Sequence, residues 1–313
     1  MSDALLRHAA HSIKVGSRSF NSAAQLLPPQ ARRGAMMLYA WCRHCDDMID
    51  GQTAGLQGTG LPQAQARAQL AALRVQTAAA YAGHAPTHPA FEAFQEVIRR
   101  FEIPQVYAMA HLAGYEMDVE GHAYLTWEDT LTYCYRVAGV VGLMMAPILG
   151  VRQAEALDRA CDLGLAFQLT NIARDLVEDA AIGRCYVPLD WLREEGVDPA
   201  RIGAAEHRPA LARIAVRLVD AAEPYYDSAR IGLAALPLRT AWAIATAHGV
   251  YREIGVKVRA RGAAAWDERV RTSTFEKFTI LSGAGPRALQ SRWQPVGRRA
   301  DSLWSRPGIG PDG

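Results

Sequence analysis

The chain has 313 residues, half of them apolar, and its 34 basic and 32 acidic side chains give a formal net charge of +2. This near-neutral balance, without a basic run interleaved with aromatic residues, argues against nucleic acid as a partner. Five cysteines and an N-terminus, "MSDALLRHAA", that lacks the apolar core of a signal peptide indicate a cytoplasmic protein. The longest apolar run, residues 137–150, is too short for a membrane span and contains Pro147, so no transmembrane segment is expected.

Helical periodicity dominates the chain, and alternating runs of Val, Ile, Thr and Tyr that would indicate strands are scarce. The pattern predicts helices over residues 3–15, 30–50, 64–82, 89–101, 104–119, 127–149, 152–180, 207–235 and 237–260. Turn-rich segments separate them, and no internal repeat of fixed period indicates a solenoid. From residue 286 the composition turns to Gly, Pro, Arg and Ser. We therefore expect a single all-α domain, residues 1–285, followed by a flexible tail, residues 286–313.

Two pairs of aspartates recur at four-residue spacing, each near the end of a predicted helix. Asp46 and Asp50 close "CRHCDDMID", and Asp175 and Asp179 lie in "NIARDLVED", where Asn171 extends the stripe. Each step of four rotates the side chain by only about 40°, so the members of a stripe share one face. A single pair is usually a solvated face. Two pairs set in apolar sequence favour a shared site, if the two helices are neighbours in a bundle.

Hard oxygen ligands in this arrangement suit Mg²⁺, with Mn²⁺ as a substitute, because Mg²⁺ binds through one or two carboxylates plus substrate phosphates. Arginines accompany both pairs: Arg43 lies one turn before Asp46, Arg174 adjoins Asp175, and Arg184 follows in "GRCYVP". They could form simple salt bridges or bind the outer oxygens of a diphosphate. The N-terminal stretch "VGSRSF", residues 15–20, offers amides, two hydroxyls and a guanidinium as a second phosphate-binding element.

Four stretches resemble the squalene/phytoene synthase family, and most closely its bacterial phytoene-forming branch. They are "GSRSF" (16–20), "LYAWCRHCDDMID" (38–50), "YCYRVAGVVG" (133–142) and "LGLAFQLTNIARDLVEDAAIGRCYVP" (163–188). The likeness runs from about residue 8 to 280. It implies a single-domain isoprenoid-synthase helical bundle around a central cavity.

The resemblance also implies roles for individual residues. Metal ions would be held by Asp46, Asp50, Asn171, Asp175 and Asp179. Substrate diphosphates would be bound by Ser17, Arg18, Ser19, Tyr39, Arg43, Gln168, Arg174 and Tyr251. Tyr135 would border the reacting carbons, and the four aspartates would take part in catalysis with it. Gly16 and Arg18 stand where some relatives carry His and Lys.

The implied reaction joins two geranylgeranyl diphosphates head to head through prephytoene diphosphate to 15-cis-phytoene, releasing diphosphate, in carotenoid biosynthesis. We expect the last cation to lose a proton without NADPH; Tyr135, Tyr251 or diphosphate could be the base. The carbocation needs an apolar tunnel, and Gly139 and Gly142 either make room in its wall or serve helix packing. Peripheral contact with the inner membrane for product release is a further expectation.

Two other functions remain open: a C30 squalene or dehydrosqualene synthase using farnesyl diphosphate, and a non-catalytic helical scaffold. "CRHC", residues 42–45, has neither a thioredoxin-like context nor a second cysteine pair, so we interpret it as buried helical cysteines. The acidic run "EMDVE", residues 116–120, is interpreted as a polar face in which Asp118 is structural.

Overall fold

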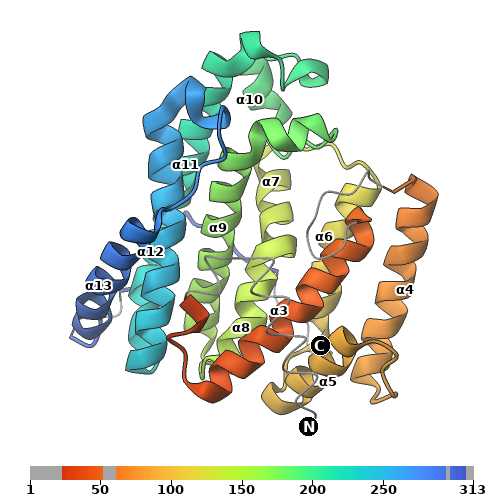
Figure 1. Cartoon of the computed structure of the whole chain (residues 1–313), viewed down its shortest axis with the longest axis vertical. Coiled ribbons are helices and arrows are strands. Elements are labelled where there is room, and N and C mark those ends of the chain that lie inside the picture. Colours follow the sequence, from red (N-terminus) through yellow and green to blue (C-terminus); the bar gives the residue numbers. More distant parts are fainter. Residues whose placement is uncertain (1–22, 52–60, 294–296, 308–313) are drawn as a thin grey trace.

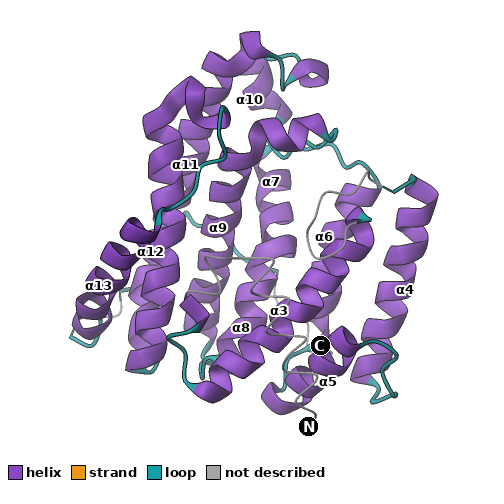
Figure 2. Cartoon of the chain, viewed as in Figure 1, coloured by secondary structure: helices purple, strands orange, loops and turns teal. Residues whose placement is uncertain are grey.

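The computed structural model describes residues 23–51, 61–293 and 297–307, and this part of the chain contains helices and no strand (Figure 2). The α-helices are α3 (Pro29–Asp50), α4 (Gln63–Tyr81), α5 (Pro89–Phe101), α6 (Gln105–Val119), α7 (Trp127–Cys134), α8 (Val140–Ile148), α9 (Ala154–Ala181), α10 (Leu189–Glu194), α11 (Arg208–Gly232), α12 (Leu238–Arg261) and α13 (Thr274–Gln290). Short 3₁₀ turns η2 (Pro199–Arg201), η3 (Ala205–His207), η4 (Leu233–Ala235) and η5 (Gly262–Trp266) connect several of them. The all-α expectation is confirmed.

Most expected helices agree with the structure to within a few residues at each end. The helix expected over residues 127–149 is interrupted by a π turn, η1 (Tyr135–Gly139), which joins α7 to α8. The helix expected over residues 3–15 lies outside the described residues. Helix α13 was not predicted, and the α10 segment was assigned to no helix.

Local sequence signals set several helix ends. Thr126 caps α7 through a reciprocal capping box with Asp129, and Pro89 occupies the first turn of α5, where its missing N–H costs nothing. Helix α3 ends at Gly51, whose φ of 62° requires the left-handed conformation that glycine adopts without strain. The helix therefore ends at Asp50, and the carboxylate of this residue lies at the helix terminus.

Helix α9 forms the middle of the molecule, between α11 and α12 on one side and α7 and α8 on the other (Figure 1). Helix α3 crosses α8 and packs on α4 and α5, while α13 lies at the outer edge against α12. One large cluster of buried side chains, with Trp41, Phe94, Leu143 and Leu165 fully enclosed, joins these layers. This packing fixes the ends of α3 and α9 relative to each other.

Small residues let α9 approach the α7–η1–α8 helix closely. A Cβ atom on Gly142 would lie 2.2 Å from the carbonyl oxygen of Ala160, and one on Gly164 would lie 2.4 Å from that of Ala138. A Cβ on Gly139 would come within 2.8 Å of Leu165. The glycines of the "VAGVVG" motif are therefore packing residues at a helix crossing. Of the two interpretations left open by the sequence, the structure supports packing over a tunnel wall.

The combined helix Trp127–Ile148 is the one stretch within the described ranges that is apolar and long enough to cross a membrane. Its 22 residues exceed the run recognised in the sequence, because α7 and η1 continue it at the N-terminal end. More than half of its most apolar window is buried inside the protein. That burial is the pattern of a core helix.

The chain after residue 285 contacts the bundle. The boundary expected there falls inside α13, which continues to Gln290. Further on, Arg299 forms a bidentate ion pair with Asp162 on α9, at 2.9 and 2.7 Å, and Arg306 Nε lies 2.5 Å from Asp158. Asp162 is fully buried, so the C-terminal segment supplies the counter-charge of a core carboxylate. A composition rich in Gly, Pro and Arg cannot reveal partners that lie so far away in the sequence.

Candidate active site

The ends of α3 and α9 carry the two predicted aspartate pairs, and Arg184 connects them. Arg184 lies in the loop after α9, yet its Nη2 donates to Oδ1 of Asp50 on α3 at 2.6 Å. The same guanidinium lies close to Asp179 and Asp118, where it opposes the rise in pKa that burial imposes on both carboxyls. The carboxylates of α3, α6 and α9 therefore surround one arginine, and we call these groups the acidic cluster.

Other arginines pair with the remaining carboxylates of the cluster. Arg43 Nη1 lies 2.7 Å from Asp46 Oδ2, and its Nη2 lies 2.7 Å from Asp47 Oδ1. Arg174 makes a bidentate contact with Asp175, at 2.8 and 2.5 Å. Arg269, from the segment before α13, donates to the same carboxylate at 3.0 Å. Guanidinium groups thus neutralise carboxylates that would otherwise repel one another.

Asp179 and Asp118 have strongly shifted acidities. Burial raises the pKa of Asp179 to about 7, and neighbouring Asp175 and Asp118 add to the effect while Arg184 opposes it. Burial likewise raises the pKa of Asp118 to about 6, against the influence of Arg184. Like charges close together in a partly desolvated site favour proton uptake unless a cation is added.

Asn171 offers an oxygen that no described residue engages. Its Nδ2 donates to Oε1 of Gln168 at 3.3 Å, whereas its Oδ1 is buried and accepts no hydrogen bond from residues 23–51, 61–293 or 297–307. A buried acceptor beside a carboxylate stripe fits a hard cation, since the donor set is oxygen throughout. Within the described ranges, however, no three Asp, Glu, His or Cys side chains converge closely enough to form a metal site alone. An ion here would need further ligands, such as phosphate oxygens and water.

Several predicted diphosphate-binding residues lie around the same centre. Burial raises the pKa of Tyr39 above its usual range, with Arg43 lowering it and Tyr251 and Asp46 raising it further, so these side chains are neighbours. Tyr251 stacks on Phe167 with ring centroids 4.1 Å apart. Ser17, Arg18 and Ser19 lie outside the described residues.

Tyr135 lies against residues outside the acidic cluster, among them Trp304 and Cys161, and its place beside the reacting carbons stays a prediction. Its ring centroid lies 5.2 Å from that of Trp304 in the C-terminal segment. Tyr133, two residues earlier, stacks on Tyr186 at 4.3 Å and donates to Oδ2 of Asp118 at 3.3 Å. The position of Tyr135 in the helical repeat indicates its packing. Tyr135 lies four residues before Gly139 and therefore on the side of the helix that packs against α9.

Sequence reasoning also missed other members of the site. Asp118, which the sequence indicates as structural, and Tyr186 both lie against Arg184 and Tyr133. Arg269 is a third such residue, and it lies in no motif. Its pairing with Asp175 and Glu178 depends on how the chain returns from α12 to α9, which no local pattern specifies.

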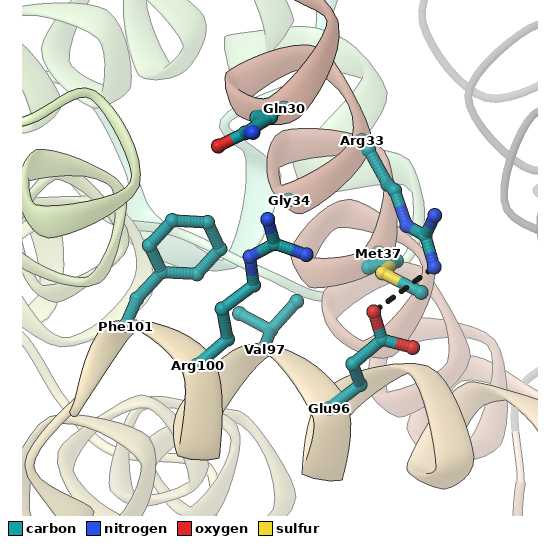
Figure 3. A pocket seen from close by; sticks show the side chains of 8 residues that line it. All are labelled: Gln30, Arg33, Gly34, Met37, Glu96, Val97, Arg100 and Phe101. Atoms are coloured by element: carbon teal, nitrogen blue, oxygen red, sulfur yellow. Dashed lines mark hydrogen bonds and ion pairs between the residues drawn. The ribbon is translucent and has the colours of Figure 1, made fainter. Parts of the chain in front are cut away.

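Two surface hollows lie elsewhere. Figure 3 shows one between α3 and α5, where Arg33 pairs with Glu96 at 3.0 Å above Met37 and Val97. This hollow leaves almost no room for a water molecule, and none of its lining residues belongs to the acidic cluster. The other has a volume of about 520 Å³ and lies between α12 and α13. Neither hollow is the candidate active site.

An all-helical bundle with carboxylate pairs and arginines gathered at the ends of two facing helices belongs to the class of proteins suited to metal-assisted diphosphate chemistry. Residues 13–276 match the sequence model of the squalene/phytoene synthase family, and the chain belongs to that family.

Individual relatives are close. The chain is 54% identical to a phytoene synthase from Pseudescherichia vulneris, over 97% of this chain and 98% of the relative. It is 55% identical to a 15-cis-phytoene synthase from Pantoea ananas, with the same coverage. Among solved structures it is similar to a dehydrosqualene synthase in complex with ligand, with a TM-score of 0.82 and 28% identity over 92% of this chain and 97% of the other.

Proposed function

We propose that this protein condenses two geranylgeranyl diphosphates head to head, through prephytoene diphosphate, to 15-cis-phytoene with release of diphosphate, a step of carotenoid biosynthesis. The observation that carries the proposal is the identity of 54–55% to phytoene synthases over 97% of the chain. It is supported by the acidic cluster, which retains both aspartate pairs and their arginines. The lower identity of 28% to a dehydrosqualene synthase makes the C30 reaction the second candidate.

We infer that the metal is Mg²⁺, with Mn²⁺ able to replace it. Its ligands on the protein would be the oxygens of Asp46, Asp50, Asn171, Asp175 and Asp179. When bound, such ions neutralise charge on the leaving diphosphate. The buried Asn171 Oδ1, which accepts no hydrogen bond from the described residues, and the raised pKa of Asp179 support a cation at this place.

The arginines of the cluster serve as internal counter-ions that can be exchanged. Arg43 and Arg174 now bind carboxylates, and each presents a planar fork that also fits a phosphate oxygen pair. We expect these guanidinium groups to move from carboxylate to diphosphate when the carboxylates acquire cations. That exchange would stabilise the departing charge without introducing water.

The aromatic residues next to the cluster would protect the reacting carbons. Tyr251 and Phe167 form one stacked pair, and Tyr133 and Tyr186 form another, in which Tyr186 lies near Arg184. Rings of this kind exclude water and stabilise positive charge through their faces. We propose that Tyr133 takes the position beside the reacting carbons that the sequence assigned to Tyr135, and that the last cation loses a proton without NADPH.

The experiment that tests the function is diphosphate release by the purified protein with Mg²⁺ and either geranylgeranyl or farnesyl diphosphate. We expect release with the C20 substrate and only weak turnover of the C15 substrate. Preference for farnesyl diphosphate would favour the C30 synthase. Absence of release from both would favour the helical scaffold and overturn the proposal.

A further inference from the structure

The outer face of α13 is apolar and uncharged, although it faces solvent. Phe275, Phe278, Leu289 and Trp293 are 78%, 66%, 46% and 74% exposed. The intervening outward positions are Thr279, Ser282 and Pro286, which are also exposed. We call this set of residues the α13 stripe.

The stripe follows the helical period over about five turns, since its members recur at intervals of three or four residues. The helical path continues beyond Gln290, because the amide of Trp293 donates to the carbonyl of Gln290 at 3.1 Å. The opposite face of α13 packs on α12 through Ala284 and Ala288. A helix that needed only to remain soluble would carry charged groups on its outer face, and this stripe has none.

The stripe adjoins an apolar groove of about 520 Å³ between α12 and α13. Trp242 and Leu238 on α12, which are 36% and 48% exposed, line it together with Leu26 and Leu289. Other exposed large apolar residues, such as Val75 on α4 and Val106 on α6, lie on different elements. Figure 1 places α13 at the edge of the molecule, and Leu289 belongs both to the stripe and to the lining of the groove, so the two are continuous.

The segment that carries this surface is basic. Between residues 271 and 293 the basic side chains are Arg271, Lys277, Arg287 and Arg292, against one acid, Glu276. The carboxylate of Glu276 is already neutralised by Lys257 Nζ at 2.6 Å. A basic helix with Phe and Trp along its outer face has the composition of a helix that lies in a membrane interface. The charge complements anionic headgroups.

We propose that the α13 stripe and the adjoining groove dock the protein onto the anionic surface of a lipid bilayer, with α13 lying in the plane of the headgroups. The inference is independent of the reaction assigned above. The proposed reaction adds a reason for the docking. Arg269, which binds Asp175 in the acidic cluster, lies six residues before Phe275 of the stripe. A bilayer beneath α13 would therefore lie next to the site that handles long prenyl chains.

The test is co-sedimentation of the full-length protein with vesicles of phosphatidylcholine alone or mixed with phosphatidylglycerol. We expect binding to the anionic vesicles that weakens with salt. Phe275→Ser, Phe278→Ser and Trp293→Ser combined should lower the bound-to-free ratio by about tenfold or more. The matched control combines Val75→Ser, Val106→Ser and Leu125→Ser, which removes three exposed apolar residues from other parts of the chain and should leave binding unchanged.

Circular dichroism and thermal unfolding verify that each triple variant is folded. Diphosphate release in detergent micelles separates docking from catalysis, because the stripe variant should keep its turnover there. A wild-type protein that binds anionic vesicles but releases no diphosphate would refute the proposed reaction and support docking. The proposal is overturned if the wild type ignores anionic vesicles or if the stripe variant binds them as well as the control. A wild-type dimer that dissociates in the stripe variant, without a change in vesicle binding, would assign the face to a second copy of the chain.

Discussion

Arginine side chains neutralise much of the acidic cluster in the substrate-free protein. Asp50, Asp46 and Asp175 each have a guanidinium within 3.0 Å, whereas Asp179 has a raised pKa. Such a cluster contributes little to folding, because its charges cost desolvation and repel one another. Substitutions at these carboxylates should therefore lower turnover without lowering the stability of the fold.

We predict that Asp50→Asn or Asp175→Asn lowers turnover by about 100-fold or more, because each removes charge that opposes the diphosphate. Helical content by circular dichroism should remain nearly unchanged. Asp190→Asn, in an exposed pair with Arg193, is the matched control and should keep full activity. Near wild-type rates in both site variants at saturating Mg²⁺ would refute the metal assignment.

Asp179 allows a prediction about pH and stability. Its pKa is raised by burial to about 7 in the folded protein, above the value of about 3.9 expected in the unfolded chain. The folded state then binds the proton more tightly, so the stability contribution falls as pH rises from about 4 to 7.

Asp179→Asn should therefore raise the melting temperature of the metal-free protein by a few degrees at about pH 7.5, and the gain should shrink at about pH 5. Differential scanning fluorimetry across this range measures both. An equal or lower melting temperature of the variant at the higher pH would show that Asp179 is not held in an unfavourable charged state.

At the residue scale, the sequence allowed the motif aspartates and their arginines to be selected, because identity and spacing determine which side of a helix they occupy. It did not allow the choice between Tyr133 and Tyr135 until the packing face of the motif was known. Arg269 could not be found at all, since its partners Asp175 and Glu178 are about 90 residues away in the chain. Long-range pairing leaves no local pattern.

At the scale of elements, the crossing of α8 and α9 depends on glycine. Because a Cβ at position 142 would meet a backbone carbonyl at 2.2 Å, one of the helices would have to shift. Close helix contact of this kind fixes the register of α9, which carries Asp175 and Asp179.

We predict that Gly142→Ala costs about 2–3 kcal/mol, as overpacking does, and lowers the melting temperature by several degrees. Gly283→Ala, at a helical position with no neighbouring atom within 4 Å, is the control and should be neutral or slightly stabilising. The preference for C20 over C15 substrate should persist in the folded fraction. A switch toward farnesyl diphosphate would restore the interpretation of these glycines as part of a tunnel wall.

The C-terminal segment provides a second element-scale prediction from two adjacent arginines. Arg299→Met leaves the buried carboxylate of Asp162 with Ser228 as its one hydrogen-bond donor among the described residues, and should cost about 3 kcal/mol. Arg298→Met removes an ion pair with Asp301 in which both side chains are more than 80% exposed, and should have no measurable effect. Chemical denaturation measures the free energy of unfolding of both variants. Equal values would contradict the claim that the fold depends on the pair between Arg299 and Asp162.

Helix α13 shows why one element escaped sequence analysis. Gly283, Gly285 and Pro286 resemble a loop, although the surrounding residues form a continuous helix that packs through alanines. Ser273 and Glu276 form a capping box three residues apart, a start signal that the sequence does contain. The start signal at Ser273 is therefore followed by residues that favour a loop, and the packing of Ala284 and Ala288 decides for the helix.

At the scale of the whole molecule, periodicity predicted an all-helical bundle, and the motifs predicted the family. The position of one helix against another was beyond reach, because it depends on side chains such as Gly142 and Ala160 that meet only in the folded protein. The same limit applies to the α13 stripe, which is visible only once its opposite face is known to pack on α12.

The central claim is that the bundle makes a C40 hydrocarbon by proton loss from the final cation. The most direct measurement is product analysis after incubation with geranylgeranyl diphosphate and Mg²⁺, with and without NADPH. Proton loss leaves a central conjugated triene, so we predict a C40 product with near-ultraviolet absorbance whose mass and rate of formation are unaffected by NADPH. A product two hydrogens heavier that lacks this absorbance when NADPH is present would contradict the account.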